Sequence, residues 1–222
     1  LDHGAVVARK NKVVKTLVSG VAASIKQHGV TVVYAKGQIL SKSAEGFAVL
    51  AGSETYIGKN VLVATGSKAL IPPIPGLKEA FDAGIAVTNR EILDLAELPA
   101  SLCVIGGGVI GLEMASYFAT AGVKVSVVEM LDKIGGYTDS EIAAALQKQM
   151  EQQGVTFHLG SKVTKLEGGT VYFESAQGTG QVDAEKVLVS IGRRANTEGL
   201  GLENVGAVVT KQGLVTDEQM KT

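Results

Sequence analysis

The sequence of 222 residues predicts an α/β fold built on a parallel sheet. The main observation is an order of patterns from Leu102 onward: strand, glycine-rich turn, helix, strand, helix, strand. Parallel strands need crossover helices, so this alternation indicates βαβ units. The composition agrees, because 45% of the residues are hydrophobic and 19% are charged, which is enough for a substantial buried core.

The first predicted segment covers residues 1–84. Apolar residues recur with a spacing near 3.6 over residues 5–28, which predicts an amphipathic helix ended by Gly29. Short segments rich in β-branched residues then predict strands at 31–34, 47–51 and 61–64. A turn with three prolines at residues 72–76 marks a change of composition and suggests a domain boundary.

The second predicted segment, residues 85–192, holds the alternating helices and strands. One helix is expected at 109–121, stopped by Gly122. A second is expected after a capping box at 138–141, with an apolar face and a C-terminal glycine. Its apolar face is formed by Ile142, Leu146 and Met150, and the glycine is Gly154. Residues 193–222 are glycine-rich and resemble the opening of another sheet.

A glycine-rich motif of the form G-x-G-x-x-G lies between the first strand and helix of this segment. It consists of Gly106, Gly107, Gly108, Val109, Ile110 and Gly111. Gly106 can make a tight turn, Gly108 leaves room for a pyrophosphate, and Gly111 lets the helix pack closely on the sheet. Free amide groups and the positive helix end would favour a bound diphosphate.

The strand predicted at residues 123–128 ends in Glu129. An acidic side chain about 20 residues after the glycine loop accepts hydrogen bonds from the adenosine ribose. Its carboxylate would repel a 2′-phosphate, and Lys133 is the one nearby cation that keeps NADP open as an alternative. The pattern therefore predicts a Rossmann-type domain with NAD as its ligand.

Charge and residue composition argue against several other functions. A net charge of −1 and a pI near 6.4 give no bulk attraction to nucleic acid or to an anionic membrane, and no apolar run is long enough to span one. The single cysteine, Cys103, lies in an apolar run and is expected to be buried and inert. We find no metal cluster and no nucleophile with a base, so no catalytic residue is predicted.

Two further stretches extend the pattern beyond the glycine loop. The glycine motif GGGVIGLE at residues 106–113 is flanked by two such stretches. One is VLVATGS at residues 61–67, which the proline-rich turn follows, and the other is VLVSIGRRAN at residues 187–196. In order and spacing they resemble the flavin disulfide oxidoreductases, and among these the dihydrolipoamide dehydrogenases, over almost the whole chain. The resemblance implies that residues 1–84 are part of an FAD-binding domain, 85–192 form the NAD-binding domain, and 193–222 begin the return to the FAD domain.

The resemblance also implies roles for individual residues. The glycine loop, Glu113 and Glu129 would line NAD, with Glu113 paired to a lysine beside the flavin. Val163 would lie near the adenine and Gly192 near the nicotinamide. The residues implied for the FAD region are Gly37, Thr65, Gly66, Ser67 and Arg193.

Dihydrolipoamide dehydrogenases pass electrons from dihydrolipoamide through a disulfide and FAD to NAD. They are cytoplasmic homodimers in bacteria and serve 2-oxo acid dehydrogenase or glycine cleavage complexes. This chain has no cysteine pair, no second glycine loop and no base from a C-terminal domain, so we expect an internal portion that is inactive alone. Mercuric reductase, NADH oxidase, transhydrogenase and a nucleotide-binding module without chemistry stay open as alternatives.

Overall fold

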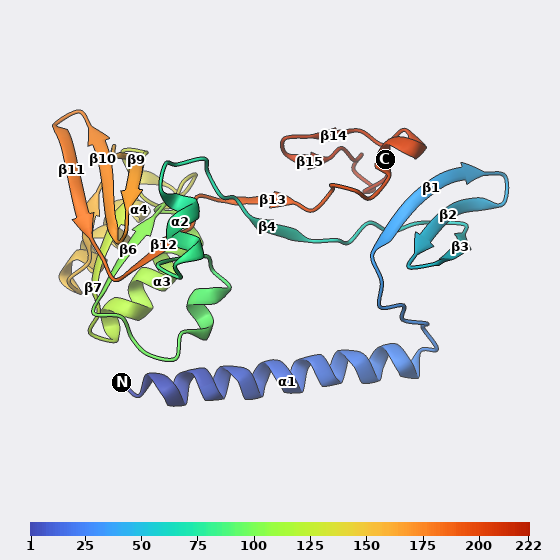
Figure 1. Ribbon diagram of the computed structural model, residues 1–222, viewed down its shortest axis with the longest axis horizontal. Helices are drawn as coiled ribbons and strands as arrows, with labels where there is room; N and C mark the ends of the chain where they lie inside the picture. Colours follow the sequence, from blue (N-terminus) through green and yellow to red (C-terminus); the bar gives the residue numbers. More distant parts are fainter. The chain divides into compact units, whose positions relative to one another are not determined.

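The computed structural model describes residues 1–222 as two compact units. The first comprises Leu1–Val14 and Ala69–Gly192, and the second comprises Lys15–Lys68 and Arg193–Thr222. The long helix α1 (His3–Gln27) contributes residues to both (Figure 1). By their contacts, residues 69–84 belong to the unit that continues to Gly192. The sequence-based boundary after residue 84 had instead grouped them with residues 1–68.

A five-stranded sheet forms the centre of the first unit. Its strands lie in the order β5 (Ala86–Val87), β12 (Lys186–Val189), β6 (Ser101–Ile105), β7 (Lys124–Val128) and β8 (Thr156–His158). Every pair of neighbours is parallel. The predicted parallel α/β fold is confirmed.

Different elements cover the two faces of this sheet (Figure 1). Helices α3 (Val109–Thr120) and α4 (Ser140–Gln152) pack on one face, with Val104 and Val127 in their core. The other face packs against α2 (Leu77–Asp82) and an antiparallel sheet of β9 (Lys162–Glu167), β10 (Thr170–Ser175) and β11 (Gly178–Asp183). A short 3-10 helix, η1 (Glu91–Asp94), precedes β6. Successive residues of β6 alternate between the two cores, as the period of a strand requires.

The start of α4 differs from the sequence-based expectation. The N-cap is Asp139, whose carboxylate accepts hydrogen bonds from the backbone N–H groups of Glu141 (2.9 Å) and Ile142 (3.4 Å). The hydroxyl of Thr138 donates to the carbonyl of Gly135 instead. A capping box led by Thr138 was therefore wrong, because the stronger Asp acceptor lies one residue later. The buried face is also shifted: Met150 is buried with Ala143, and Ile142 is 62% exposed.

The second unit is built from small sheets. Strands β1 (Gly37–Ser43), β2 (Gly46–Ala51) and β3 (Glu54–Gly58) form an antiparallel sheet. Strand β13 (Arg193–Ala195) pairs with β4 (Ser67–Ala69). After η2 (Leu202–Val205), β14 (Val209–Thr210) and β15 (Gly213–Leu214) make a short hairpin. The backbone of Ile39 donates to Leu200 at 2.7 Å, which joins β1 to the C-terminal segment.

Two of the expected strands, residues 31–34 and 61–64, are irregular in the structure. Their β-branched composition is suited to a sheet, but no neighbouring segment forms a ladder with them. A strand exists only where another backbone satisfies its N–H and C=O groups. Leu62 is accordingly 89% exposed, so these two predictions were wrong.

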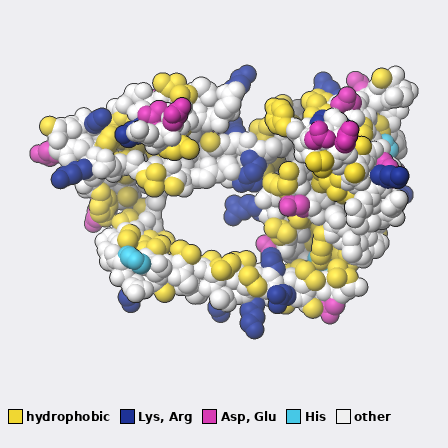
Figure 2. Space-filling model, turned by 180° about the vertical axis from the view of Figure 1, so that it is seen from behind, with side chains coloured by type: hydrophobic (Ala, Val, Ile, Leu, Met, Phe, Trp, Pro, Cys, Tyr) yellow, Lys and Arg dark blue, Asp and Glu magenta, His cyan; other side chains and the backbone are white.

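Helix α1 is confirmed, and Gly29 follows it with a φ of 67°. Its first turn is anchored by the buried His3, whose Nδ1 shares a 2.8 Å hydrogen bond with the Tyr117 hydroxyl, while Nε2 meets the Leu95 carbonyl at 2.9 Å. Further along, Leu17 and other apolar side chains are exposed. Figure 2 shows hydrophobic side chains along this helix, at the bottom of the view, with lysine and arginine beneath them. Neither α1 nor any other helix is apolar enough over a sufficient length to cross a membrane.

Candidate functional site

The glycine loop connects β6 to α3 at the carboxyl end of the parallel strands. Gly106 has a φ of 106°, and a Cβ atom there would lie 2.5 Å from the carbonyl oxygen of Ser190. Its N–H donates to the carbonyl of Val128 at 2.9 Å. The tight turn therefore requires glycine both for its backbone angle and for its close approach to Ser190, which follows β12.

Gly111 brings α3 close to the loop and to Ser190, the residue after β12. A Cβ atom there would lie 2.2 Å from the carbonyl oxygen of Gly106 and 2.6 Å from Oγ of Ser190. The Ser190 hydroxyl also donates to the Gly106 carbonyl at 3.2 Å. Sequence reasoning gave Ser190 no role, since its only signal is its position directly after the apolar residues of β12.

The N-terminus of α3 is open. Gly108 is the N-cap in an extended conformation, no side chain caps the helix, and a Cβ atom on Gly108 would meet no atom within 4 Å. The first four N–H groups of a helix have no intrahelical acceptor, and here they belong to a first turn that contains Val109 and Ile110 and no acidic residue. These donors and the positive end of the helix dipole suit an anionic group.

Glu129 is held beside this helix start. Its carboxylate accepts hydrogen bonds from the backbone N–H groups of Gly107 (2.5 Å) and Leu131 (2.8 Å). Its own backbone is fixed by His158, which accepts at 2.9 Å, and by Ser161, which donates at 2.8 Å. Each carboxylate oxygen still has lone pairs free, so the group can accept two more hydrogen bonds without breaking these.

Lys133 lies in the loop between Glu129 and α4. Its ammonium group donates to the backbone carbonyl of Thr138. In the same loop, the N–H of Gly135 donates to the carbonyl of Gly107 at 2.8 Å, so the loop is tied directly to the glycine motif. The one cation considered for a 2′-phosphate is thus already engaged with the backbone.

The other residues expected to contact NAD lie on α3, on β9 and in the turn between β12 and β13. Glu113 is exposed on α3, one turn after the loop. Val163 is half-buried on β9, shortly after Ser161, which bonds to the Glu129 backbone. Gly192 has a φ of 121° and follows Ser190, and its carbonyl accepts a 3.0 Å hydrogen bond from Leu70. Hydrogen bonds therefore tie the segments that carry Val163 and Gly192 to the loop.

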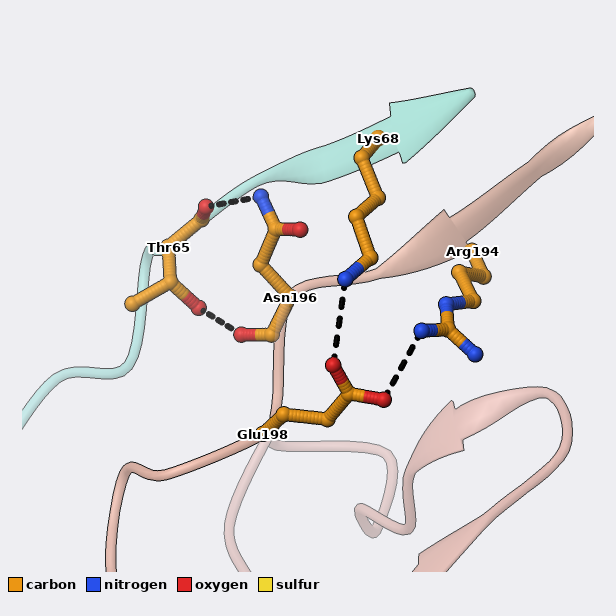
Figure 3. Close-up of polar contacts among 5 residues, drawn as sticks. All are labelled: Thr65, Lys68, Arg194, Asn196 and Glu198. Carbon is orange, nitrogen blue, oxygen red and sulfur yellow. Dashed lines mark hydrogen bonds and ion pairs between the residues drawn. The ribbon is translucent and has the colours of Figure 1, made fainter. Parts of the chain in front are cut away.

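In the second unit, the ATGS segment is paired with the segment after β13 (Figure 3). The Thr65 hydroxyl donates to the Asn196 carbonyl at 2.6 Å, and the Asn196 side chain donates to the Thr65 carbonyl at 3.1 Å. The Asn196 N–H donates to the carbonyl of Gly66, which has a φ of 70°. Asn196 stands in the RRAN motif, yet sequence reasoning gave it no role.

Cationic side chains gather around the same pair of strands. The Arg193 guanidinium donates to the hydroxyl (2.8 Å) and the carbonyl (2.7 Å) of Ser67. Lys68 and Arg194 pair with Glu198 at 3.1 and 2.8 Å (Figure 3), and the hydrogen bond from Lys68 is the main reason that the pKa of Glu198 is lowered. These pairs are exposed, so they order the segment more than they stabilise the fold. Gly37, also expected near FAD, opens β1 opposite Ala51.

Cys103 is fully buried in the middle of β6. Burial raises the pKa of its thiol to about 12, so almost no reactive thiolate forms near neutral pH. We expect a thiol reagent such as Ellman's reagent to label the native protein at pH 8 only at the rate of unfolding, and to label it at once in denaturant. Rapid labelling of the native protein would contradict the inert position assigned to this thiol.

The parallel sheet, the glycine loop and the flanking antiparallel sheet define an α/β protein with the fold of the flavoprotein disulfide reductases. The structure superposes on the HOCl-induced flavoprotein disulfide reductase RclA from Escherichia coli with a TM-score of 0.88 and 26% identity, covering 100% of this chain and 50% of that one. LpdA from Mycobacterium tuberculosis gives a TM-score of 0.84 and 27% identity over 98% of this chain and 48% of that one.

The sequence comparisons agree with the fold. The profile of the family described as pyridine nucleotide-disulphide oxidoreductase matches residues 2–222. Dihydrolipoyl dehydrogenase from Acholeplasma laidlawii is 37% identical over all of this chain and 64% of its own length. Dihydrolipoamide dehydrogenase from Chaetomium thermophilum is 37% identical over all of this chain and 45% of its own length. The chain belongs to the pyridine nucleotide-disulphide oxidoreductase family, as the sequence motifs predicted, and spans about half to two thirds of the length of these relatives.

Proposed function

We propose that the first unit binds NAD(H). The proposal depends on one observation above all: the Glu129 carboxylate is hydrogen-bonded to Gly107, beside an α3 N-terminus that no side chain caps. The arrangement offers acceptors for two ribose hydroxyls and donors for a diphosphate within one loop. A diphosphate seated over Gly108 would meet open space rather than a side chain.

The same carboxylate supports NAD over NADP. A 2′-phosphate would lie against the Glu129 carboxylate, which is a repulsive contact between like charges. Lys133 is engaged with the Thr138 carbonyl and would have to give up that bond to neutralise the phosphate. Glu113 and Gly192 would then lie toward the nicotinamide, and Val163 toward the adenine.

For the whole protein we propose a flavin-dependent oxidoreductase that transfers electrons from dihydrolipoamide through a disulfide and FAD to NAD. The support is the identity to dihydrolipoyl dehydrogenases. We assign the segment from Thr65 to Ser67, with Gly37 and Arg193, to its flavin region, and propose that it acts as a homodimer within 2-oxo acid dehydrogenase or glycine cleavage complexes. The similarity to RclA favours a second candidate, a flavoprotein disulfide reductase with another substrate. Turnover of dihydrolipoamide by the whole protein separates the two.

Calorimetry on the purified chain tests the NAD(H) proposal. NADH should bind with one site per chain and at least about tenfold more tightly than NADPH, the size of effect that a single repulsive contact can produce. ADP-ribose, which lacks the nicotinamide, should compete with NADH. Binding of neither dinucleotide, or equal affinity for both, would contradict the roles given to the loop and to Glu129.

A further inference from the structure

Two successive peptide groups of the glycine motif are held by hydrogen bonds at their carbonyl oxygens. The carbonyl of Gly106 accepts from the hydroxyl of Ser190 at 3.2 Å. The carbonyl of Gly107 accepts from the backbone N–H of Gly135 at 2.8 Å. The N–H of Gly107 is engaged as well, because it donates to the Glu129 carboxylate at 2.5 Å. The backbone of the motif therefore has defined hydrogen-bond partners in the surrounding protein.

One of these peptide groups connects Ser190 to Glu129. No peptide bond of the chain is cis, so the carbonyl of Gly106 and the N–H of Gly107 point in opposite directions from one planar group. The Ser190 hydroxyl lies at one end of this group and the Glu129 carboxylate at the other. The result is a chain of two hydrogen bonds, from a hydroxyl through an amide to a carboxylate. Hydrogen bonds in such a chain polarise one another, so each strengthens the other.

Ser190 is enclosed by the tight turn and by the start of α3. Its N–H donates to the Ile105 carbonyl at 2.8 Å, which fixes its backbone. A Cβ atom on Gly106 would lie 2.5 Å from the Ser190 carbonyl oxygen, and one on Gly111 would lie 2.6 Å from its Oγ. The open space of the motif lies instead over Gly108. Ser190 contacts the motif from the protein side, so its effect on a ligand passes through the motif.

We propose that Ser190 is a positioning residue, which sets the orientation of the Glu129 carboxylate through the peptide group between Gly106 and Gly107. The proposal rests on the proposed NAD(H) function of the first unit. With the hydroxyl present, the carboxylate stays beside the loop, where it accepts from the ribose hydroxyls and repels a 2′-phosphate. Without the hydroxyl, the Gly107 N–H is a weaker donor and the carboxylate is free to turn toward water. Binding of NADH then loses hydrogen bonds, whereas binding of NADPH loses a repulsion.

Removal of the hydroxyl should change the cofactor preference by the equivalent of one hydrogen bond. A single intramolecular hydrogen bond changes an equilibrium by about threefold to tenfold. We therefore expect Ser190→Ala to weaken NADH binding by about this factor and NADPH binding by less, so that the preference for NADH falls. Ser190→Cys should lie between the unsubstituted chain and Ser190→Ala, because a thiol is a weaker donor than a hydroxyl.

The test follows the Gly107 amide by NMR and the two affinities by calorimetry in the same purified proteins. Without a dinucleotide, the Gly107 amide proton should lie far downfield in the unsubstituted chain, since it donates to a carboxylate, and should move upfield in Ser190→Ala. Ser175→Ala is the matched control. The Ser175 hydroxyl also donates to a backbone carbonyl, that of Gly178 at 3.1 Å, but it lies at the hairpin of β10 and β11. This control should change neither the Gly107 amide nor the ratio of the affinities.

A double substitution separates positioning from a general loosening of the loop. Glu129→Gln lacks the charge on which Ser190 is proposed to act. In that background Ser190→Ala should alter the ratio of NADH to NADPH affinity by less than about twofold, the margin within which independent effects add. An equal change of the ratio with and without the charge would mean that Ser190 does not act through the carboxylate.

Three results would overturn the inference: an unchanged Gly107 amide in Ser190→Ala, an unchanged affinity ratio in that variant, or an equal change of the ratio in both backgrounds. If Ser190→Ala does not fold, Ser190→Cys gives the same readouts with a side chain that fills the space. Failure of the unsubstituted chain to bind NADH would count against the proposed NAD(H) function, and the Gly107 amide would then decide alone whether Ser190 acts on Glu129.

Discussion

Gly111→Ala should destabilise the first unit and abolish NADH binding, whereas Gly108→Ala should abolish NADH binding and leave stability unchanged. The added methyl group at Gly111 would lie 2.2 Å from the backbone carbonyl of Gly106, and a backbone atom cannot rotate away as a side chain can. Overpacking of this kind costs about 1–3 kcal/mol, and a clash with backbone belongs at the upper end. At Gly108 the methyl group meets no protein atom, so it can clash only with a ligand.

The two glycine variants are measured side by side. Urea unfolding followed by circular dichroism gives the free energy of unfolding, and calorimetry gives NADH affinity. Both substitutions add the same single methyl group to the same glycine motif, so each is the control for the other. If Gly108→Ala bound NADH normally, the open space over that residue would not be the seat of the diphosphate, and the site assigned to the loop would be wrong.

The glycine loop could be predicted from sequence because its requirements are local. A tight turn at Gly106 and a close approach at Gly111 depend on residues a few positions apart, and both are seen in the structure. The partner at that close approach, Ser190, follows a strand that is distant in the sequence, and it leaves no signal in the motif. The predicted cap of α4 was wrong for a local reason. Thr138 and Asp139 are both suitable N-cap residues, and the sequence pattern does not say which of them accepts the hydrogen bonds of the first turn.

The strands show where local patterns stop being sufficient. Residues 31–34 and 61–64 have the composition of strands, but a strand depends on a neighbour that the segment itself does not encode. The pair formed by Thr65 and Asn196 has the same character, since the two residues are 131 positions apart. Spacing within one βαβ unit predicted the place of Glu129, whereas contacts between distant segments required the structure.

The cofactor preference should follow the charge at residue 129. In the unsubstituted chain the carboxylate accepts from Gly107 and Leu131, and a 2′-phosphate would approach these two oxygens. Glu129→Arg replaces repulsion by attraction, so we expect NADPH to gain and NADH to lose affinity. A change of about 30- to 100-fold in the ratio of the two dissociation constants corresponds to removing one repulsive contact and adding one attractive contact.

Glu174→Arg is the control for this change. Glu174 is exposed on β10 in the same unit, so its substitution alters the net charge by the same amount without touching the glycine loop. Its ratio of NADH to NADPH affinity should equal that of the unsubstituted chain. The affinity ratio of Glu129→Gln should lie between those of the unsubstituted chain and Glu129→Arg. The amide removes the charge, yet its oxygen can still accept a hydrogen bond from one backbone N–H. If Glu174→Arg shifted the ratio as far as Glu129→Arg, the preference would come from the overall field of the protein. A change in the affinity ratio that occurs only with substitutions at position 129 would assign the cofactor preference to the carboxylate beside Gly107.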